Sequence, residues 1–188
     1  MKSVNLGGIA VLAASFVVSA AYAAEAQMQA PGVPNFHQIN DHVYRGAQPT
    51  SQGWESLSKL GVKVILDLRR DGENGEHSIA AESRAVTAAG MRYVNIPMNG
   101  IVAPRDADIS KALEIFNGPD PVFVHCKLGK DRTGTVVACY RISHDGWENR
   151  KAMDEAKSIG LHRIEFGMKR YIAAFQSLGA APLAVAVP

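Results

Sequence analysis

The segment from Val122 to Gly134 contains the residues of this sequence best suited to covalent chemistry. It has the sequence VFVHCKLGKDRTG, in which Cys126 directly follows an apolar run and Arg132 comes six positions later. A short loop between a strand and a helix can turn its backbone N–H groups inward, and the amino terminus of the helix adds unpaired donors and the positive end of its dipole. We therefore expect this segment to form a cradle for a phosphate group.

The residues of this cradle have distinct expected roles. The positive field favours a thiolate, so Cys126 is expected to ionise below the usual thiol value of about 8.5 and to act as the nucleophile. The planar fork of Arg132 is suited to hold two phosphoryl oxygens. We expect His125 to orient the loop by hydrogen bonds, and Thr133 to stabilise the thiolate. The predicted substrate-binding residues are Lys127, Leu128, Gly129, Lys130, Asp131, Arg132 and Thr133.

The run HCKLGKDRTG, residues 125–134, resembles the HCxxGxxR[ST]G signature of the protein tyrosine and dual-specificity phosphatases. Residues 43–49 (VYRGAQP) and 65–69 (ILDLR) are similar to segments of the atypical branch found in bacteria, fungi and plants. The resemblance spans most of the chain from Val43 onward. It implies hydrolysis of phosphate monoesters through a phosphocysteine, without a cofactor, on a phosphorylated protein or a small phosphorylated molecule.

The general acid of that family is missing from its usual place. The family places an aspartate on the loop after the strand that here ends at Ile96-Pro97, and residues 98–103 (MNGIVA) contain none. Asp106 and Asp131 are the two candidates for this catalytic role. The alternative role of Asp106 is to cap the next helix, and that of Asp131 is to shape the cradle. A further alternative is that good leaving groups need no acid.

Three other functions stay open at this point. Lys127 and Lys130 make the loop more basic than a single phosphate requires, which favours an inositol-phosphate or phospholipid phosphatase of the same mechanism. The missing aspartate allows a catalytically inactive phosphate-binding regulatory module. A sulfur-transfer or arsenate-reducing enzyme would also use a cysteine loop near an arginine, but the loop length argues against it. The histidines show no ligand spacing, so no metal is expected.

Apolar patterning predicts the elements that position this loop. A turn at Asn40-Asp41 joins two short strands, the second over 43–45, and nearly continuous apolar runs predict buried strands of a parallel or mixed sheet at 62–68, 93–97 and 122–124. Helical spacing surrounds Trp54, Val86 and Phe116, and three helices are predicted after Arg132. The fold class is therefore α/β, a three-layer αβα arrangement with a central, mainly parallel sheet and its ligand site at the carboxyl ends of the strands.

The chain is expected to form one domain behind an export signal. Residues 1–23 have the layout of a signal peptide, with Lys2, an apolar core over 9–18 and a small-x-small site at 21–23. A flexible lead-in is expected over 24–35, the phosphatase domain over 36–179 and a flexible tail over 180–188. We expect a periplasmic or secreted monomer with two free thiols and no membrane span after cleavage. The formal net charge of +2 argues against a nucleic-acid partner.

Overall fold

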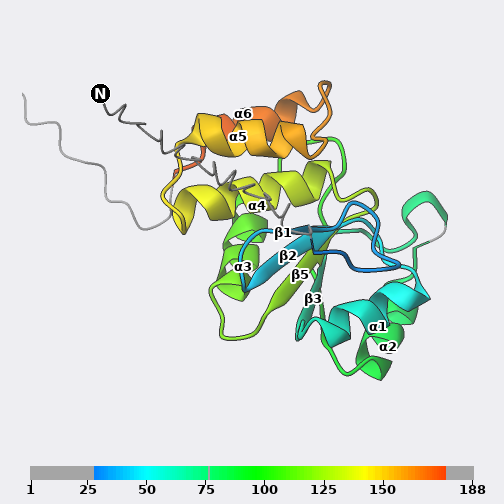
Figure 1. Ribbon diagram of the computed structural model, residues 1–188. Helices are drawn as coiled ribbons and strands as arrows, with labels where there is room; N and C mark the ends of the chain where they lie inside the picture. Colours follow the sequence, from blue (N-terminus) through cyan, green and yellow to red (C-terminus); the bar gives the residue numbers. More distant parts are fainter. Residues whose placement is uncertain (1–27, 76, 177–188) are drawn as a thin grey trace, which may run out of the picture.

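A five-stranded sheet forms the centre of the computed structural model, which describes residues 28–75 and 77–176. The strand order is β1-β2-β5-β3-β4, and only β1 is antiparallel to its neighbour. This confirms the predicted central, mainly parallel sheet, which Figure 1 shows between two groups of helices. The strands are β1 (His37–Gln38), β2 (Val43–Gly46), β3 (Val64–Asp67), β4 (Arg92–Asn95) and β5 (Val122–His125).

The three inner strands are buried along their whole length, as the apolar runs of β3 and β5 predict; β2 is buried as well, although it contains Arg45. In the strand register, Val43 and Val64 both pair with Val122, whereas Tyr44 and Ile65 both pair with Phe123. Because successive side chains point to opposite faces of a sheet, these two sets contribute to two separate hydrophobic cores.

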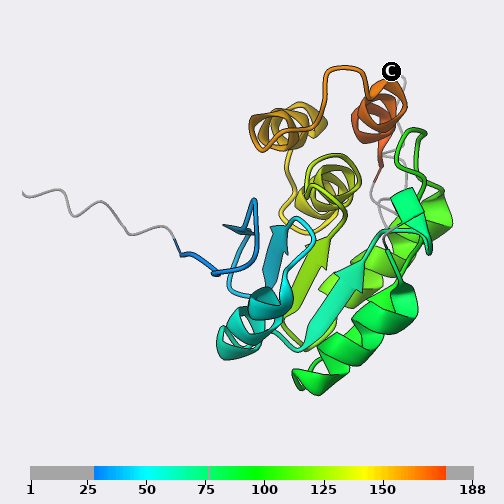
Figure 2. The same ribbon diagram turned by 90° about the vertical axis from the view of Figure 1, so that its right-hand side faces the viewer.

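Helices cover both faces of the sheet, which confirms the predicted three-layer arrangement (Figure 2). Two helices pack on the face of the sheet that contains Tyr44, Ile65 and Phe123, and four helices lie on the side of the opposite face. The first pair is α1 (Ser51–Lys59) and α2 (Ile79–Ala88). The other four are α3 (Asp106–Phe116), α4 (Asp131–Ser143), α5 (Asn149–Ser158) and α6 (Phe166–Ala174). A short 3₁₀ turn, η1 (Glu73–Gly75), follows β3.

Helix α4 is the most deeply enclosed helix of the described chain. All its residues from Arg132 to Tyr140 are buried. Its Val136 and Val137 pack in the core that α4 shares with α3 and the sheet, while Ala138 packs with Met153 of α5 and Ile172 of α6. Because neighbours surround it, the helix holds its amino terminus in a fixed position at the end of β5.

Part of the segment expected to be a flexible lead-in packs against the domain, from Ala30 onward. Ala30 and Val33 are buried in the core next to α1. The Ser56 hydroxyl donates a hydrogen bond to the Pro31 carbonyl, and the Thr50 hydroxyl donates to Gly32. Thr50 is the N-cap of α1, but its side chain makes no capping bond.

The predicted signal peptide and the whole of the predicted tail lie outside the described residues. Of the helices that the structure does describe, none combines the length and apolar character needed to cross a membrane.

Candidate active site

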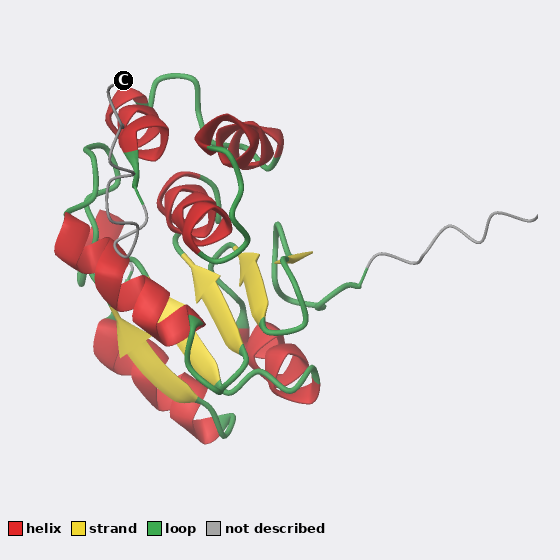
Figure 3. Ribbon diagram, turned by 90° about the vertical axis from the view of Figure 1, so that its left-hand side faces the viewer, coloured by secondary structure: helices red, strands yellow, loops and turns green. Residues whose placement is uncertain are grey.

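The predicted phosphate cradle occupies the loop between β5 and α4, at the carboxyl end of the sheet (Figure 3). Cys126 directly follows the last residue of β5 and is 3 % exposed. Gly129 adopts a φ of +67°, and a Cβ atom there would lie 2.3 Å from the backbone carbonyl of Gly46 on β2. A glycine is therefore required at this position by both its conformation and the close approach of the neighbouring strand.

Arg132 lies on the first turn of α4, and its guanidinium is fixed by several acceptors. Nη1 and Nη2 donate to the two carboxylate oxygens of Glu73 at 2.6 and 2.8 Å. Nη1 also faces the carbonyls of Leu68 and Met98 at 3.3 and 3.4 Å. Burial lowers the pKa of Arg132, but the hydrogen bond with Glu73 and the negative charge of Cys126 outweigh this effect and raise the pKa.

Glu73 was not predicted from the sequence as a residue of the site. It lies in η1, and its hydrogen bonds with Arg132 lower the pKa of its carboxyl to about 2, against the opposing effect of burial. The pair is therefore charged on both sides at neutral pH. Glu73 uses two nitrogens of the fork, while Nε of Arg132 donates to no acceptor in the described residues. That nitrogen is available to a phosphoryl oxygen.

A second arginine, Arg45 of β2, is completely buried next to the cradle. Its Nη2 donates to the Gly129 carbonyl at 2.7 Å, whereas Nε and Nη1 have no hydrogen-bond partner within the part of the chain described. Burial lowers the pKa of Arg45 to about 10, and the charges of Cys126 and Glu155 oppose that change. Arg45 is therefore cationic at neutral pH and adds positive charge next to Cys126.

His125 is fully buried on the opposite side of β5. Its Nδ1 lies 3.4 Å from the Cys126 carbonyl, and its Nε2 lies 2.9 Å from a carboxylate oxygen of Glu82 on α2. Burial lowers the pKa of His125, but the Glu82 carboxylate and the charge of Asp67 outweigh this and raise it. This geometry supports the predicted role of His125 in orienting the loop.

Further buried polar groups connect to His125. Glu82 accepts a hydrogen bond from the Gln48 amide at 2.8 Å, and Asp67 accepts one from the Tyr93 hydroxyl at 2.6 Å. The His77 Nε2 atom lies 2.9 Å from Asp67. Asp67, Glu82 and His125 offer ligand atoms within 4.8 Å of one another, a spacing that a metal ion can use. Because both carboxylates already have hydrogen-bonding partners, we interpret the group as a hydrogen-bonded support of the loop.

Each of the two candidate acids is held by a different hydrogen-bonding partner. Both carboxylate oxygens of Asp131 are engaged by His162, whose backbone N–H and ring Nδ1 each lie 2.8 Å away. This favours the alternative role of Asp131 in shaping the loop. Asp106 accepts a hydrogen bond from the Tyr171 hydroxyl at 2.8 Å and lines a hollow with Tyr171 and Phe175. The N-cap residue of α3 is Arg105, and no side-chain capping bond is made there. The hydrogen bond between Asp106 and Tyr171 instead joins α3 to α6.

The remaining predicted residues differ in their exposure. Lys127 and Leu128 are exposed, Lys130 is half-buried, and Thr133 is fully buried with no partner for its hydroxyl in the described residues. Cys139 is completely buried in the core, where burial raises the pKa of its thiol. Both cysteines are free thiols, as predicted.

A family model for "DSP-PTPase phosphatase fused to NAD+ Kinase" matches residues 21–169. The chain belongs to this family of the cysteine-dependent dual-specificity phosphatases. The model covers the cradle, both buried arginines and the Glu82 network, so the family match and the site geometry concern the same residues.

Two named relatives in the superfamily are 28% and 30% identical to this chain. The dual specificity protein phosphatase TpbA of Pseudomonas aeruginosa is 28% identical over 129 residues, which cover 67% of this chain and 55% of the relative. The phosphatidylglycerophosphate phosphatase PTPMT2 of Arabidopsis thaliana is 30% identical over 127 residues, 65% of this chain and 54% of the relative. The chain thus spans about half the length of these relatives.

The core catalytic domain of the PP-IP phosphatase SIW14 from S. cerevisiae has the same fold. Its crystal structure superposes with a TM-score of 0.66 at 23% identity, covering 79% of this chain and 89% of that chain.

Replacing Gly129 by alanine should damage the cradle. The new Cβ atom would collide with Gly46, so the loop must move, and we expect the affinity for inorganic phosphate or vanadate to fall at least about tenfold. Gly146→Ala is the matched control, because Gly146 has a φ of +66° and open space around it. That variant should lose about 1 kcal/mol of stability and bind phosphate normally. Equal phosphate affinity in the two variants, measured by calorimetry, would contradict the close fit.

Replacing Glu82 by glutamine should destabilise the domain in a pH-dependent way. Because the folded state raises the pKa of His125, the stability from this pair is fully present below about pH 6.5 and is lost as the pH rises through the folded pKa. Glu82→Gln should therefore cost about 2 kcal/mol at pH 6 and less at higher pH. Urea unfolding across this range, with the exposed Glu114→Gln as control, measures the difference. A cost that does not change with pH would refute the charged pair.

Proposed function

We propose that this chain is a phosphatase that hydrolyses phosphate monoesters through a phosphocysteine, with tyrosine or dual-specificity substrates. One observation carries the proposal. Cys126 lies where β5 ends and α4 begins, within the field of two buried arginines that hold positive charge at neutral pH. A cysteine in such a position is suited to attack an anionic phosphate ester.

The reaction has two displacements. The Cys126 sulfur attacks phosphorus, an S–P bond forms, and the bond from phosphorus to the leaving oxygen breaks. The free Nε of Arg132 donates to an equatorial oxygen of the transferred group, while Glu73 keeps the fork in place. Water then attacks phosphorus, the S–P bond breaks, and inorganic phosphate and the thiolate are released.

The leaving oxygen needs a proton, and each of the two candidate acids already has a partner in this structure. Asp131 begins the helix that contains Arg132, but its carboxylate is engaged by His162, and Asp106 is bound to Tyr171. An aryl phosphate is therefore the first substrate to test, because its leaving group is stable as an anion and its release requires neither carboxylate to be free.

We also propose that the domain is exported to the periplasm or beyond. The support is the layout of residues 1–23, with Lys2, the apolar run over 9–18 and the small residues before Ala24. The full-length chain expressed in a bacterium should be recovered from the periplasmic fraction with a mass that begins at Ala24. Recovery of the uncleaved chain in the cytoplasm or in the membrane would reject this proposal.

The decisive variant for catalysis is Cys126→Ser. Loss of the thiolate should reduce turnover of an aryl phosphate by about 10³-fold or more, while the intact cradle still binds vanadate or phosphate. Cys139→Ala is the control, because Cys139 is a buried thiol of the core. Normal turnover by Cys126→Ser would exclude the mechanism. Phosphate binding without turnover by the wild-type protein would instead identify an inactive regulatory module.

A further inference from the structure

Exposed apolar side chains gather around the cradle. Among the described residues, six large apolar side chains are at least 41 % exposed, and five of these lie on three loops around the cradle or, for Phe166, at the start of α6. We call these five the apolar rim: Ile101 (76 %), Val102 (54 %), Leu128 (48 %), Ile164 (75 %) and Phe166 (69 %). Scattered exposed apolar residues are ordinary, but their concentration at one site indicates binding.

The first loop of the rim passes next to the reactive groups. A Cβ atom placed on Gly100 would lie 3.7 Å from the Arg132 guanidinium carbon. The Asn99 side chain accepts hydrogen bonds from the backbone N–H groups of Ile101 and Val102, at 2.8 and 3.3 Å. This turn is therefore ordered, and it exposes Ile101 and Val102 beside the arginine that would hold the phosphate.

The loop between α5 and α6 completes the rim. His162 binds Asp131 of the cradle, and a Cβ atom on Gly160 would contact the methylene groups of Lys130 at 3.1 Å. At the start of α6, a Cβ atom on Gly167 would lie 2.9 Å from the backbone nitrogen of Ala103. The loop that carries Ile164, together with the start of α6 at Phe166, therefore contacts both the cradle and the Asn99 turn.

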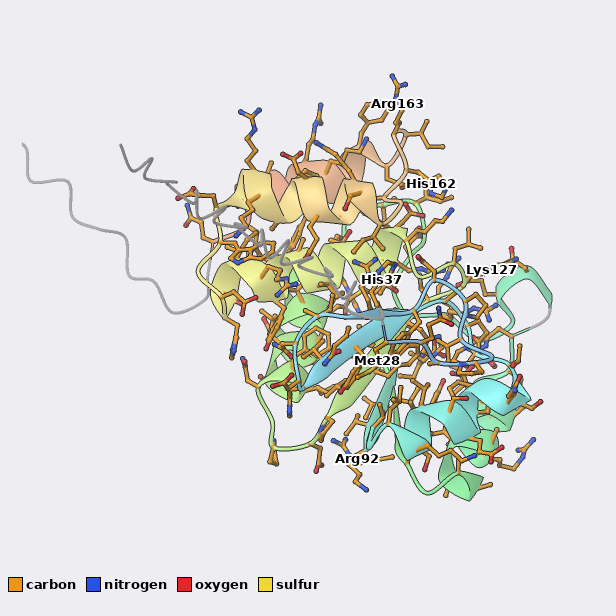
Figure 4. The ribbon with its side chains drawn as sticks, viewed as in Figure 1. Met28, His37, Arg92, Lys127, His162 and Arg163 are labelled. Atoms are coloured by element: carbon orange, nitrogen blue, oxygen red, sulfur yellow. The ribbon has the colours of Figure 1, made fainter. Side chains whose placement is uncertain are left out.

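Positive charge accompanies these apolar groups. Figure 4 shows Lys127, His162 and Arg163 at the same end of the molecule. Within the described ranges, Lys127, Lys130 and Arg163 take part in no ion pair, whereas the nearby acids Glu73 and Asp131 are paired with Arg132 and His162. Glu165, which lies between Ile164 and Phe166, is the one acid of this loop without an ion pair among the described residues, so the three unpaired cations leave the surface around the cradle cationic on balance.

We propose that the apolar rim inserts into an anionic lipid surface, and that the cradle takes a phosphomonoester carried by a lipid headgroup. This inference deepens the proposed phosphatase function and rests on it. Exposed aliphatic tips on separate loops can enter the interface between headgroups and acyl chains, while lysine and arginine attract anionic lipids. In that orientation the mouth of the cradle faces the headgroups.

The composition of the rim favours a lipid surface over a phosphorylated protein. Its five members are four aliphatic residues and one phenylalanine. Protein-binding hot spots are enriched in tryptophan, tyrosine and arginine, and they usually form a packed centre surrounded by polar groups. Here the apolar groups stand on the outside of a polar cradle. This is the arrangement expected when the substrate phosphate is reached through a lipid interface.

The test uses a triple variant, Ile101→Ser with Ile164→Ser and Phe166→Ser, which leaves Cys126, Arg132 and Leu128 unchanged. Met28→Ser is the matched control, since Met28 is 41 % exposed and lies outside the rim. Each protein is sedimented with vesicles of phosphatidylcholine and phosphatidic acid, and with vesicles of phosphatidylcholine alone. Phosphate release is measured from phosphatidic acid in the vesicles, from a soluble aryl phosphate and from a tyrosine-phosphorylated peptide.

We expect the wild-type protein and Met28→Ser to bind the anionic vesicles and to release phosphate from them. The triple variant should lose vesicle binding and phosphatidic acid hydrolysis at least about tenfold, with aryl phosphate turnover within about twofold of wild type. Wild-type protein that does not bind the vesicles, or a triple variant that still hydrolyses phosphatidic acid normally, would overturn the proposal. Selective loss of phosphopeptide turnover would assign the rim to a protein partner instead.

The same measurements separate this inference from the proposed function. If no substrate is turned over, including the aryl phosphate, the phosphatase function fails, while vesicle sedimentation still decides whether the rim binds lipid. If the aryl phosphate is turned over but the vesicles are neither bound nor hydrolysed, only the lipid inference fails.

Discussion

The structure depends on the concentration of positive charge around one sulfur atom at the point where β5 turns into α4. Cys126 is buried there between the amino terminus of a helix and two arginines, each of which remains charged at neutral pH. Burying an arginine without a partner is costly. Arg132 has Glu73 as its partner, whereas the hydrogen bond that Arg45 makes among the described residues goes to the neutral Gly129 carbonyl, with the charges of Cys126, Glu155 and Arg141 in its surroundings. An anion in the cradle would compensate that charge.

Much of the remaining fold keeps this arrangement rigid. Helix α4 is enclosed by α3, α5, α6 and the sheet, so its first turn cannot shift without disturbing the core. On the other face, α2 brings Glu82 to His125, and the hydrogen bonds of Gln48 and Tyr93 hold the two carboxylates there. The close approach of β2 to Gly129 fixes the distance between the loop backbone and Gly46. Packing and polar contacts thus act on the same few backbone atoms.

The sequence predicted the layers, the strands and the cradle, because these follow from apolar periodicity and from residues adjacent in the chain. It did not predict Glu73, Glu82 or Arg45 as parts of the site, because their roles arise from contacts between distant segments. A signal was available for Arg45, and also for Asp67 of the His125 network, because both are charged residues inside predicted strands, where a buried charge requires a function or a partner. Nothing adjacent to Glu73 indicates its contact with Arg132. Likewise, the burial of Ala30 and Val33 depends on α1 and could not be inferred from a segment rich in proline and glycine.

The most direct test of the central claim is to identify the covalent intermediate. The wild-type protein is mixed with an aryl phosphate, quenched in acid within milliseconds, digested and analysed by mass spectrometry. The account predicts a phosphate on the peptide that contains Cys126, in an amount that approaches one per active chain before steady state. Phosphate attached to a different residue, or steady turnover with no phosphorylated Cys126 peptide at any time, would contradict it.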